Sequence, residues 1–264
     1  MLTRVITAII LAILTTTVVL WAPQQVFDGI ILLIIAAGLY EFFKLTLPTE
    51  KLYRITGILW GIIFSATLLF LRHSNAPSAV ILSGLFIILL IYMHHATTFE
   101  GVVSKVGITL LGVVYLGATL PFWGFLRAMP HGRALVFMGI AAAALCDTFA
   151  MFAGKAIGGK KFAPLTSPNK TVIGFIAGFL GSLAGVYIVR IIGWQELPLL
   201  HVLIIGLAIG FIGPMGDLIE SLFKRDYHVK DSGNVIPGHG GVLDRLDAMI
   251  FVGPFVYWYA KWAL

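Results

Sequence analysis

The densest group of chemically active side chains lies in and just before residues 221–247, SLFKRDYHVKDSGNVIPGHGGVLDRLD, between two apolar runs. Asp217 and Glu220 are three residues apart, so on a helix they share one face. Asp244 and Asp247 have the same spacing and likewise face one way on the next helix. The sequence therefore predicts two groups of carboxylates at the ends of apolar helices. The first group follows Gly213, Pro214 and Gly216, which are expected to loosen the helix end.

A turn built from small residues separates the two groups, namely Pro237, Gly238, Gly240 and Gly241. Such a backbone can approach a ligand closely because no bulky side chain covers it. The neighbouring histidines, His228 and His239, are too isolated in the sequence to form a zinc site. Hard carboxylate oxygens with few competing nitrogen or sulfur ligands instead favour Mg²⁺, which proteins commonly hold with one or two carboxylates and phosphate oxygens.

Basic side chains accompany these acids and are Lys224, Arg225, Lys230 and Arg245. They would neutralise phosphate oxygens that the metal leaves uncovered, an arrangement typical of phosphoryl or nucleotidyl transfer. A salt-bridged helix end is the structural alternative for the same charges. The spacing favours transfer chemistry at a membrane surface.

A second region, residues 146–171, begins inside an apolar run with Asp147. A carboxylate within the membrane costs at least about 2.5 kcal/mol on insertion scales unless it faces a partner or water. We therefore expect Asp147 either to have a function or to be hydrogen-bonded to a neighbouring helix. A functional carboxylate inside the membrane leaves an ion-coupled transporter open as the alternative function. A flexible basic segment that can meet phosphate follows, with Gly154, Lys155, Gly158, Gly159, Lys160 and Lys161. An anion site at the start of the next helix would use Ser167, Pro168, Asn169, Lys170 and Thr171.

The elements that position these residues are membrane helices, because 59% of the 264 residues are hydrophobic and only 11% are charged. Soluble proteins carry about 25% charged residues and rarely expose so much apolar surface. The apolar runs approach the roughly 20 residues that a helix needs to cross the bilayer, and they lack the alternation of barrel strands. They are residues 5–21, 29–43, 55–71, 77–93, 106–126, 134–153, 172–192, 198–216 and 247–264. We therefore expect an all-α, polytopic bundle of about nine transmembrane helices.

Basic residues in the short loops predict the orientation of this bundle. With the N-terminus on the cytoplasmic side, the Lys and Arg residues left outside are Arg72, Arg127, Arg133, Arg190 and Lys261, a minority of 18. Both charged regions then face the cytoplasm, at what we expect to be the inner (plasma) membrane of a bacterium. The net charge of +6 suits anionic lipid headgroups and phosphates, and no base-stacking motif indicates nucleic acid.

The chain is expected to form one integral membrane domain, residues 1–264. Residues 1–133 form a lipid-embedded scaffold in this interpretation, and residues 134–264 form the catalytic half with its two cytoplasmic loops. The first run shares features with a signal peptide, but no A-x-A cleavage motif precedes Pro23, which favours a retained helix. The single cysteine, Cys146, is expected to be buried.

The pattern S-x-x-K-R-x-x-x-x-K-D-x-G-x-x-x-P-x-H-G-G-x-x-D-R-x-D, from Ser221 to Asp247, resembles the signature of the phosphatidate cytidylyltransferases, also called CDP-diacylglycerol synthases. The resemblance extends upstream through Asp147 and the segment 167–171, and so covers about the C-terminal half. It implies that CTP and phosphatidic acid react to give CDP-diacylglycerol and pyrophosphate with Mg²⁺. The implied partners are CTP, phosphatidic acid and the lipid bilayer, without nucleic acid and with a homodimer as one option.

The resemblance also assigns roles to individual residues. Asp217 and Asp244 would be metal ligands, and Asp247 would serve the metal or orient basic side chains. The implied catalytic set is Asp217, Asp244, Lys224, Arg225, Asp247 and His239. The implied substrate-binding set is Asp147, Lys160, Ser167, Lys170, Thr171, Lys230, Asp231, Gly240, Gly241 and Arg245. The basic members would hold the triphosphate or a lipid phosphate, and His239 would contact a phosphate or shape the turn.

One position departs from the family pattern, because Ile173 stands where the family usually carries glutamate.

The acyl chains must remain in lipid while the headgroup reaches the metal, so we expect a lateral opening beside Asp217 and Asp244. A CDP-alcohol phosphotransferase is disfavoured because the sequence lacks a D-G-x-x-A-R run. A non-catalytic lipid-binding scaffold would tolerate Asp244→Asn.

Overall fold

The computed structural model describes residues 2–96, 98–233 and 240–264, with side chains from residue 6 onward. The first four helices are α1 (Leu2–Trp21), α2 (Gln24–Thr46), α3 (Lys51–Phe70) and α4 (Ala76–His95). The next span consists of α5 (Val102–Gly112), the π-helix η1 (Val113–Ala118) and α6 (Phe122–Arg127). The rest of the chain contains α7 (Gly132–Ala156), β1 (Lys161–Ala163), β2 (Ser167–Thr171), α8 (Val172–Gly193), α9 (Leu199–Asp226), α10 (Leu243–Leu246) and α11 (Met249–Ala263).

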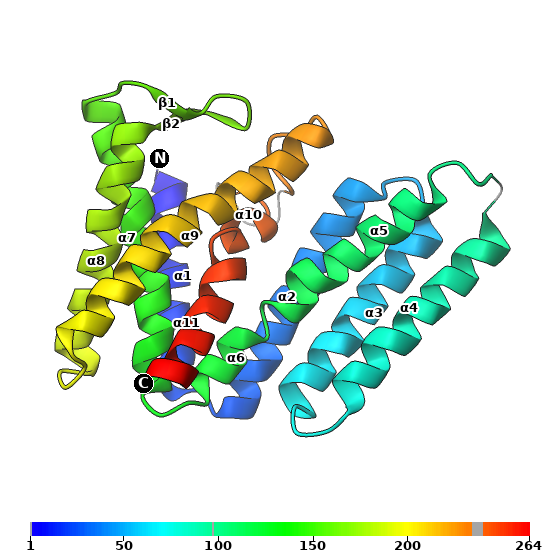
Figure 1. Cartoon of the computed structure of the whole chain (residues 1–264), viewed down its shortest axis with the longest axis horizontal. Helices are drawn as coiled ribbons and strands as arrows, with labels where there is room; N and C mark the ends of the chain where they lie inside the picture. The colour runs from blue at the N-terminus through cyan, green and yellow to red at the C-terminus, as the bar shows by residue number, and fades with distance from the viewer. Residues whose placement is uncertain (1, 97, 234–239) are drawn as a thin grey trace.

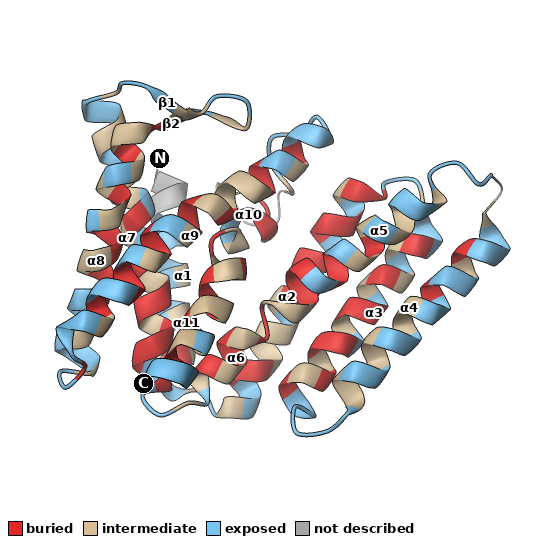
Figure 2. Ribbon diagram, in the orientation of Figure 1, coloured by how far each residue is buried: buried red, intermediate tan, exposed pale blue. Residues whose placement is uncertain are grey.

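The predicted all-α membrane bundle is confirmed in its main architecture, because every predicted apolar run corresponds to helical structure. Within the described residues, 7 helices are long and apolar enough to cross about 30 Å of hydrocarbon. α1 is also apolar over Ile6–Trp21, the part whose side chains are described, and the 15-residue α11 is shorter than those spans. Large apolar side chains such as Leu82 and Phe86 are exposed on α4, on the outer surface that lipid would cover (Figure 2).

Two groups of helices make up the bundle (Figure 1). α7, α8 and α9 pack together, and α2 to α5 pack as a second group. An aromatic cluster joins the groups, since the ring of Phe223 on α9 lies 6.0 Å from Phe42 on α2 and 5.4 Å from Tyr115 on η1. Both are edge-to-face contacts, the geometry that aromatic pairs favour. The two groups therefore share a packed core directly beside the charged end of α9.

α9 differs from the sequence expectation, which ended the eighth apolar run at residue 216. The helix continues through Pro214 to Asp226. Proline lacks an N–H and so frees the carbonyl of Gly210, but the Cys146 thiol lies 4.0 Å from that oxygen as a weak hydrogen-bond donor. Beyond the proline, the Glu220–Lys224 pair at i and i+4 supports further helix. The acids near Pro214 therefore stand on a continuous helix and not on a loosened end.

The connection between α7 and α8 also differs from the expected flexible segment. β1 and β2 form an antiparallel hairpin in which Lys161 pairs with Thr171 and Ala163 with Ser167. Figure 1 places this hairpin and the C-terminal end of α9 at the same end of the bundle. The two charged regions that the sequence separates by about fifty residues therefore lie on one side of the molecule.

Candidate active site at one end of the bundle

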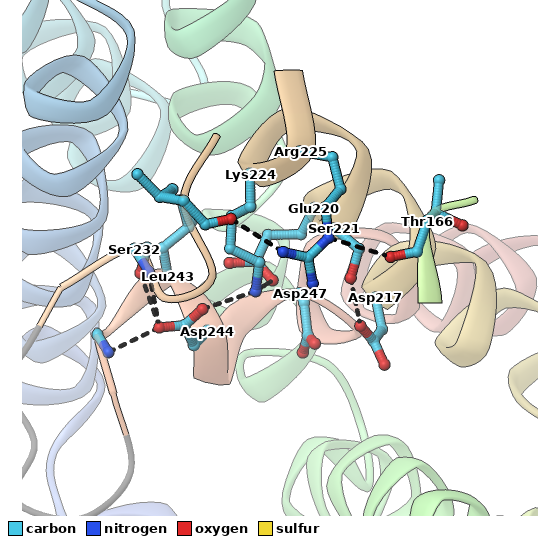
Figure 3. A network of polar contacts seen from close by, with 12 residues as sticks. Thr166, Asp217, Glu220, Ser221, Lys224, Arg225, Ser232, Leu243, Asp244 and Asp247 are labelled. Carbon is cyan, nitrogen blue, oxygen red and sulfur yellow. Dashed lines mark hydrogen bonds and ion pairs between the residues drawn. The ribbon is translucent and has the colours of Figure 1, made fainter. Parts of the chain in front are cut away.

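Three carboxylates converge where α9 meets the start of α11. Oxygens of Asp217, Glu220 and Asp247 all lie within 4.8 Å of one another. Asp217 and Glu220 are presented by one turn of α9, and Asp247 follows α10. The approach is close because position 216 is glycine: a Cβ there would lie 2.4 Å from the carbonyl oxygen of Asp247. Figure 3 shows these acids together with the basic residues around them.

Two buried oxygens beside this cluster have no hydrogen-bond partner among the described residues. They are Glu220 Oε1 and the hydroxyl of Tyr115, whose side chains are 1% and 5% exposed. An unpaired buried carboxylate oxygen is costly, and a cation that it can coordinate removes that cost. The donor set of three hard oxygens close together fits Mg²⁺.

Lys224 bridges the acidic cluster and Asp244. Its Nζ donates to Glu220 Oε2 at 2.5 Å and to Asp244 Oδ1 at 2.7 Å, and the residue is only 8% exposed. The ammonium therefore compensates two carboxylates in a site with little water, where unpaired charges would be unstable. Lys224 thus links Asp244 to Glu220, which lies in the same acidic cluster as Asp217.

Asp244 is surrounded by donors in addition to Lys224. Its Oδ2 accepts hydrogen bonds from the backbone N–H of Ser232 at 3.0 Å and of Gly241 at 2.8 Å, and the Ser232 hydroxyl lies 3.0 Å away (Figure 3). Burial alone would raise the pKa of the Asp244 carboxyl, but these hydrogen bonds outweigh burial and hold that pKa below its ordinary value. Asp244 is therefore an anion with both oxygens already engaged.

Glu41 reaches the same network from α2, far away in the sequence. The side chain is 2% exposed and accepts hydrogen bonds from the backbone N–H groups of Val242 at 3.0 Å and Leu243 at 2.8 Å. Its Oε2 also accepts from the Ser232 hydroxyl at 3.0 Å. Sequence reasoning treated Glu41 only as a charge near the end of an apolar run.

A cavity of about 690 Å³ opens beside the acidic cluster, between α7, α8, α9 and the hairpin. Its polar lining comprises Asp147, Lys155, Lys161, Asn169, Lys170, Thr171 and Asp217. Its apolar lining includes Met151, Phe162 and Phe175. Lys170 joins the two charged regions there, because its Nζ lies 2.7 Å from Asp217 Oδ2 and donates to the carbonyl of Pro214 at 3.3 Å. The predicted residues Asp147, Lys170, Thr171 and Asp217 thus line one cavity.

The other predicted site residues occupy the surroundings of this centre. Arg225 is exposed, and its guanidinium donates to the carbonyls of Thr166 at 3.4 Å and Val229 at 3.1 Å. Four more of the predicted site residues are exposed, namely Lys160, Lys230, Asp231 and Arg245. Thr171 caps α8 by accepting the N–H of Gly174 at 3.1 Å, and Ser167 pairs within the hairpin. Gly240 adopts the left-handed φ of 82°, and Gly241 is buried. His239 lies outside the described residues.

Sequence reasoning missed three contributors to the site: Glu41, Tyr115 and Ser232. Glu41 and Tyr115 stand on segments without a recognisable motif, and a spacing argument does not connect α2 or η1 to α9. Ser232 lies within the signature from Ser221 to Asp247, but at a position that the pattern leaves unspecified. An acid within an apolar run, which drew attention to Asp147, is the one signal that Glu41 also carries. In the structure Glu41 is buried, whereas Asp147 is exposed. Ile173, the departure from the family pattern, packs near Gly159, where a Cβ would lie 3.3 Å from its Cδ1.

Comparison with known proteins finds one family along nearly the whole chain. The sequence pattern described as "Cytidylyltransferase family" matches residues 2–263. A phosphatidate cytidylyltransferase of Bacillus subtilis (strain 168) is 33% identical over 236 residues, which cover 86% of this chain and 86% of the relative. The phosphatidate cytidylyltransferase of Brucella abortus biovar 1 (strain 9-941) is 32% identical over 265 residues, or 97% of this chain and 91% of the relative. A Staphylococcus saprophyticus phosphatidate cytidylyltransferase is 37% identical over 147 residues, 56% of each chain.

Proposed function

The chain belongs to the cytidylyltransferase family as a phosphatidate cytidylyltransferase, and on that premise we propose that it condenses CTP with phosphatidic acid at the cytoplasmic face of the plasma membrane. The products are CDP-diacylglycerol and pyrophosphate, and the reaction depends on Mg²⁺. The observation that carries the proposal is the cluster of Asp217, Glu220 and Asp247 beside a cavity that is both polar and apolar.

The reaction joins an oxygen of the lipid phosphate to the α-phosphorus of CTP. The bond from that phosphorus to the oxygen bridging to the β-phosphorus breaks, and pyrophosphate leaves with the electron pair. A phosphate monoester with a second pKa near 6 is mostly dianionic at neutral pH, so the attacking oxygen needs no strong general base. The protein therefore contributes mainly positioning and charge compensation.

The residues that would hold Mg²⁺ are Asp217, Glu220 and Asp247, with Asp244 on the far side of Lys224. Asp244 would join the ligand set only by releasing donors that its oxygens already accept. When bound, Mg²⁺ would offset the triphosphate charge and polarise the phosphorus under attack. The unpaired oxygen of Glu220 supports this assignment over one limited to Asp217 and Asp244.

The basic residues would act on the phosphates. Lys170 faces the cavity from the hairpin side, so it would meet a phosphate that enters beside Asp217. Arg225, Lys230 and Arg245 are exposed around the opening and would draw in the anionic nucleotide. Lys224 would keep the carboxylates in place, because it is buried between Glu220 and Asp244. The apolar lining from Met151, Phe162 and Phe175 suits the first part of a diacyl lipid.

The test is a reaction of the purified chain with labelled CTP and phosphatidic acid, with Mg²⁺ and with EDTA. We expect label from the α-phosphate in the lipid phase, an equal amount of pyrophosphate in the aqueous phase, and neither product after chelation. Ion flux in proteoliposomes that depends on Asp147, without any consumption of CTP, would establish the transporter alternative instead.

A further inference from the structure

The segment that carries Asp244 is attached to α2 through one buried carboxylate. Glu41 accepts the backbone N–H groups of Val242 and Leu243, at the start of α10, and the hydroxyl of Ser232. Hydrogen bonds to an ionised acceptor are stronger than those between neutral groups, and a buried acceptor is held by its full set of donors. Residues 232 and 242–243 are therefore fixed relative to α2, an element of the other group of helices.

The contact around Glu41 is tight as well as polar. A Cβ at Gly241 would lie 2.4 Å from Glu41 Oε2, and one at Gly233 would lie 2.6 Å from Oε1. Only glycine at these two positions lets the backbone close around the carboxylate. The segment therefore encloses Glu41 on two sides, which leaves little room for the loop to shift while the carboxylate stays in place.

Ser232 connects Glu41 to Asp244. Its hydroxyl lies 3.0 Å from Glu41 Oε2 and 3.0 Å from Asp244 Oδ2, and its backbone N–H donates to Asp244. A hydroxyl has one hydrogen, so it donates to one of the two carboxylates at a time. Asp244 in turn accepts from Lys224, which donates to Glu220. A continuous polar path thus runs from Glu41 to the acidic cluster.

We propose that Glu41 is a positioning residue for cytidylyl transfer: it sets the place of Asp244 and, through Lys224, that of Glu220 in the acidic cluster. The inference rests on the proposed function and adds to it a residue from the part of the chain that the family signature does not reach. Among the described residues, Glu41 accepts hydrogen bonds from Ser232, Val242 and Leu243 and none from the acidic cluster, so its effect on the reaction passes through Ser232 and Asp244. Groups that orient the residues next to a metal typically change metal affinity or activity about ten- to hundred-fold when removed.

The test compares Glu41→Gln with Glu50→Gln in the full-length protein. Glutamine keeps the size of Glu41 but places an NH₂ group among N–H and O–H donors. Glu50 is a matched carboxylate on the same group of helices, paired with Lys105 at 2.6 Å and separate from the site. We expect Glu41→Gln to lower kcat of the folded, monodisperse protein about ten- to hundred-fold and to raise the Mg²⁺ concentration needed for half-maximal rate. Glu50→Gln should keep the kcat and Mg²⁺ requirement of the parent protein.

A purely structural role would give a different result. It would lower the yield and melting temperature of Glu41→Gln while the folded fraction kept the parent kcat and Mg²⁺ requirement, and that outcome would overturn the inference. If Glu41→Gln does not fold, Ser232→Ala tests the same path, because it keeps Glu41 and both backbone hydrogen bonds. We expect about a three- to ten-fold loss of kcat from Ser232→Ala, and an unchanged kcat would refute the path. A parent protein without CTP turnover would instead defeat the proposed function itself.

Discussion

Asp244 and Asp247 are three residues apart, yet their surroundings differ. Asp244 accepts hydrogen bonds from Lys224, Ser232 and Gly241, while Asp247 points to the cluster with Asp217 and Glu220 (Figure 3). The family resemblance assigned Asp244 to the metal and gave Asp247 the role of serving the metal or orienting basic side chains. In the structure, Asp244 holds its hydrogen-bond donors in place, whereas Asp247 belongs to the group of carboxylates that could bind a cation.

Substitution of each acid should therefore give a different kinetic defect. We expect Asp247→Asn to raise the Mg²⁺ concentration for half-maximal turnover about ten- to hundred-fold, because it removes one oxygen of the cluster. Asp244→Asn should lower turnover even at saturating Mg²⁺, because Lys224 loses one of its two anionic partners. Initial rates over a Mg²⁺ titration measure both effects, with exposed Asp226→Asn as the control. The same Mg²⁺ shift in both variants would contradict this division.

The site residues that could be predicted from sequence are those on one helix turn or in one motif. Asp217, Lys224, Asp244 and Asp247 follow from spacing, because helix geometry brings residues three and four apart together. Glu41 does not follow, because its partners lie about 200 residues away and only packing of α2 against the C-terminal segment brings them together. Lys224 was expected to hold triphosphate, with a salt-bridged helix end as the alternative that spacing left open. Its burial between Glu220 and Asp244 agrees with that alternative.

At the level of elements, the crossing of α9 and the start of α11 determines whether the acidic cluster forms. From the sequence, Gly213, Pro214 and Gly216 were predicted to loosen the end of the helix at this crossing. Gly216 instead allows the backbone of Asp247 and Ala248 to lie against α9. Gly213, one turn earlier, has only the Cβ of Ala248 near its missing side chain, at 3.8 Å. The two glycines therefore differ in how strongly they are required.

Alanine at each position provides a matched pair. Gly216→Ala should lower stability by about 1–3 kcal/mol and reduce turnover, because the new methyl group would displace Asp247 from the cluster. Gly213→Ala should leave both properties close to those of the parent, since 3.8 Å is an ordinary contact distance. Thermal melting in detergent and CTP turnover measure the pair. Equal effects at the two positions would show that the close approach at residue 216 is unimportant.

Some elements lie beyond what periodicity can predict. The run 106–126 reads as one uniform helix, but the structure divides it into α5, the π-helix η1 and α6. π-helical turns are rare and frequently occur at functional sites. η1 carries Tyr115, whose buried hydroxyl has no hydrogen-bond partner in the described part of the chain. The hairpin β1–β2 was also missed: the sequence predicted a flexible basic segment up to Lys161 and the start of a helix at residues 167–171, but residues 167–171 form strand β2.

At the level of the whole molecule, the orientation in the membrane stays a prediction from the distribution of basic residues. The structure adds that both charged regions lie at one end of the bundle, so they must face the same side of the membrane, whichever side that is. The division into a scaffold, residues 1–133, and a catalytic half, residues 134–264, is also a prediction. Glu41 and Tyr115 belong to the first part and still contact or adjoin the site, because the aromatic cluster packs the two groups of helices together.

Cysteine labelling tests the orientation. The parent chain has one cysteine, Cys146, which is 1% exposed and should not react with a membrane-impermeant maleimide. We expect Glu196→Cys, at the exposed connection between α8 and α9, to be labelled on intact cells. Lys230→Cys, beyond the other end of α9, should be labelled only after the membrane is permeabilised. The reverse pattern would place the site on the outer side and contradict a cytoplasmic source of CTP.

The length of α9 has a consequence for how the two substrates meet. Its 28 residues extend roughly 40 Å, more than the ~30 Å of hydrocarbon, so we expect its C-terminal part to reach the depth where glycerol and phosphate groups of lipids reside. Asp217 and Glu220 stand about 27 and 32 Å along the helix, near that boundary. On the proposed function, phosphatidic acid would react without being lifted toward water, and the soluble nucleotide would make the approach instead. The liponucleotide would remain in the leaflet that supplied its precursor, while pyrophosphate would diffuse away.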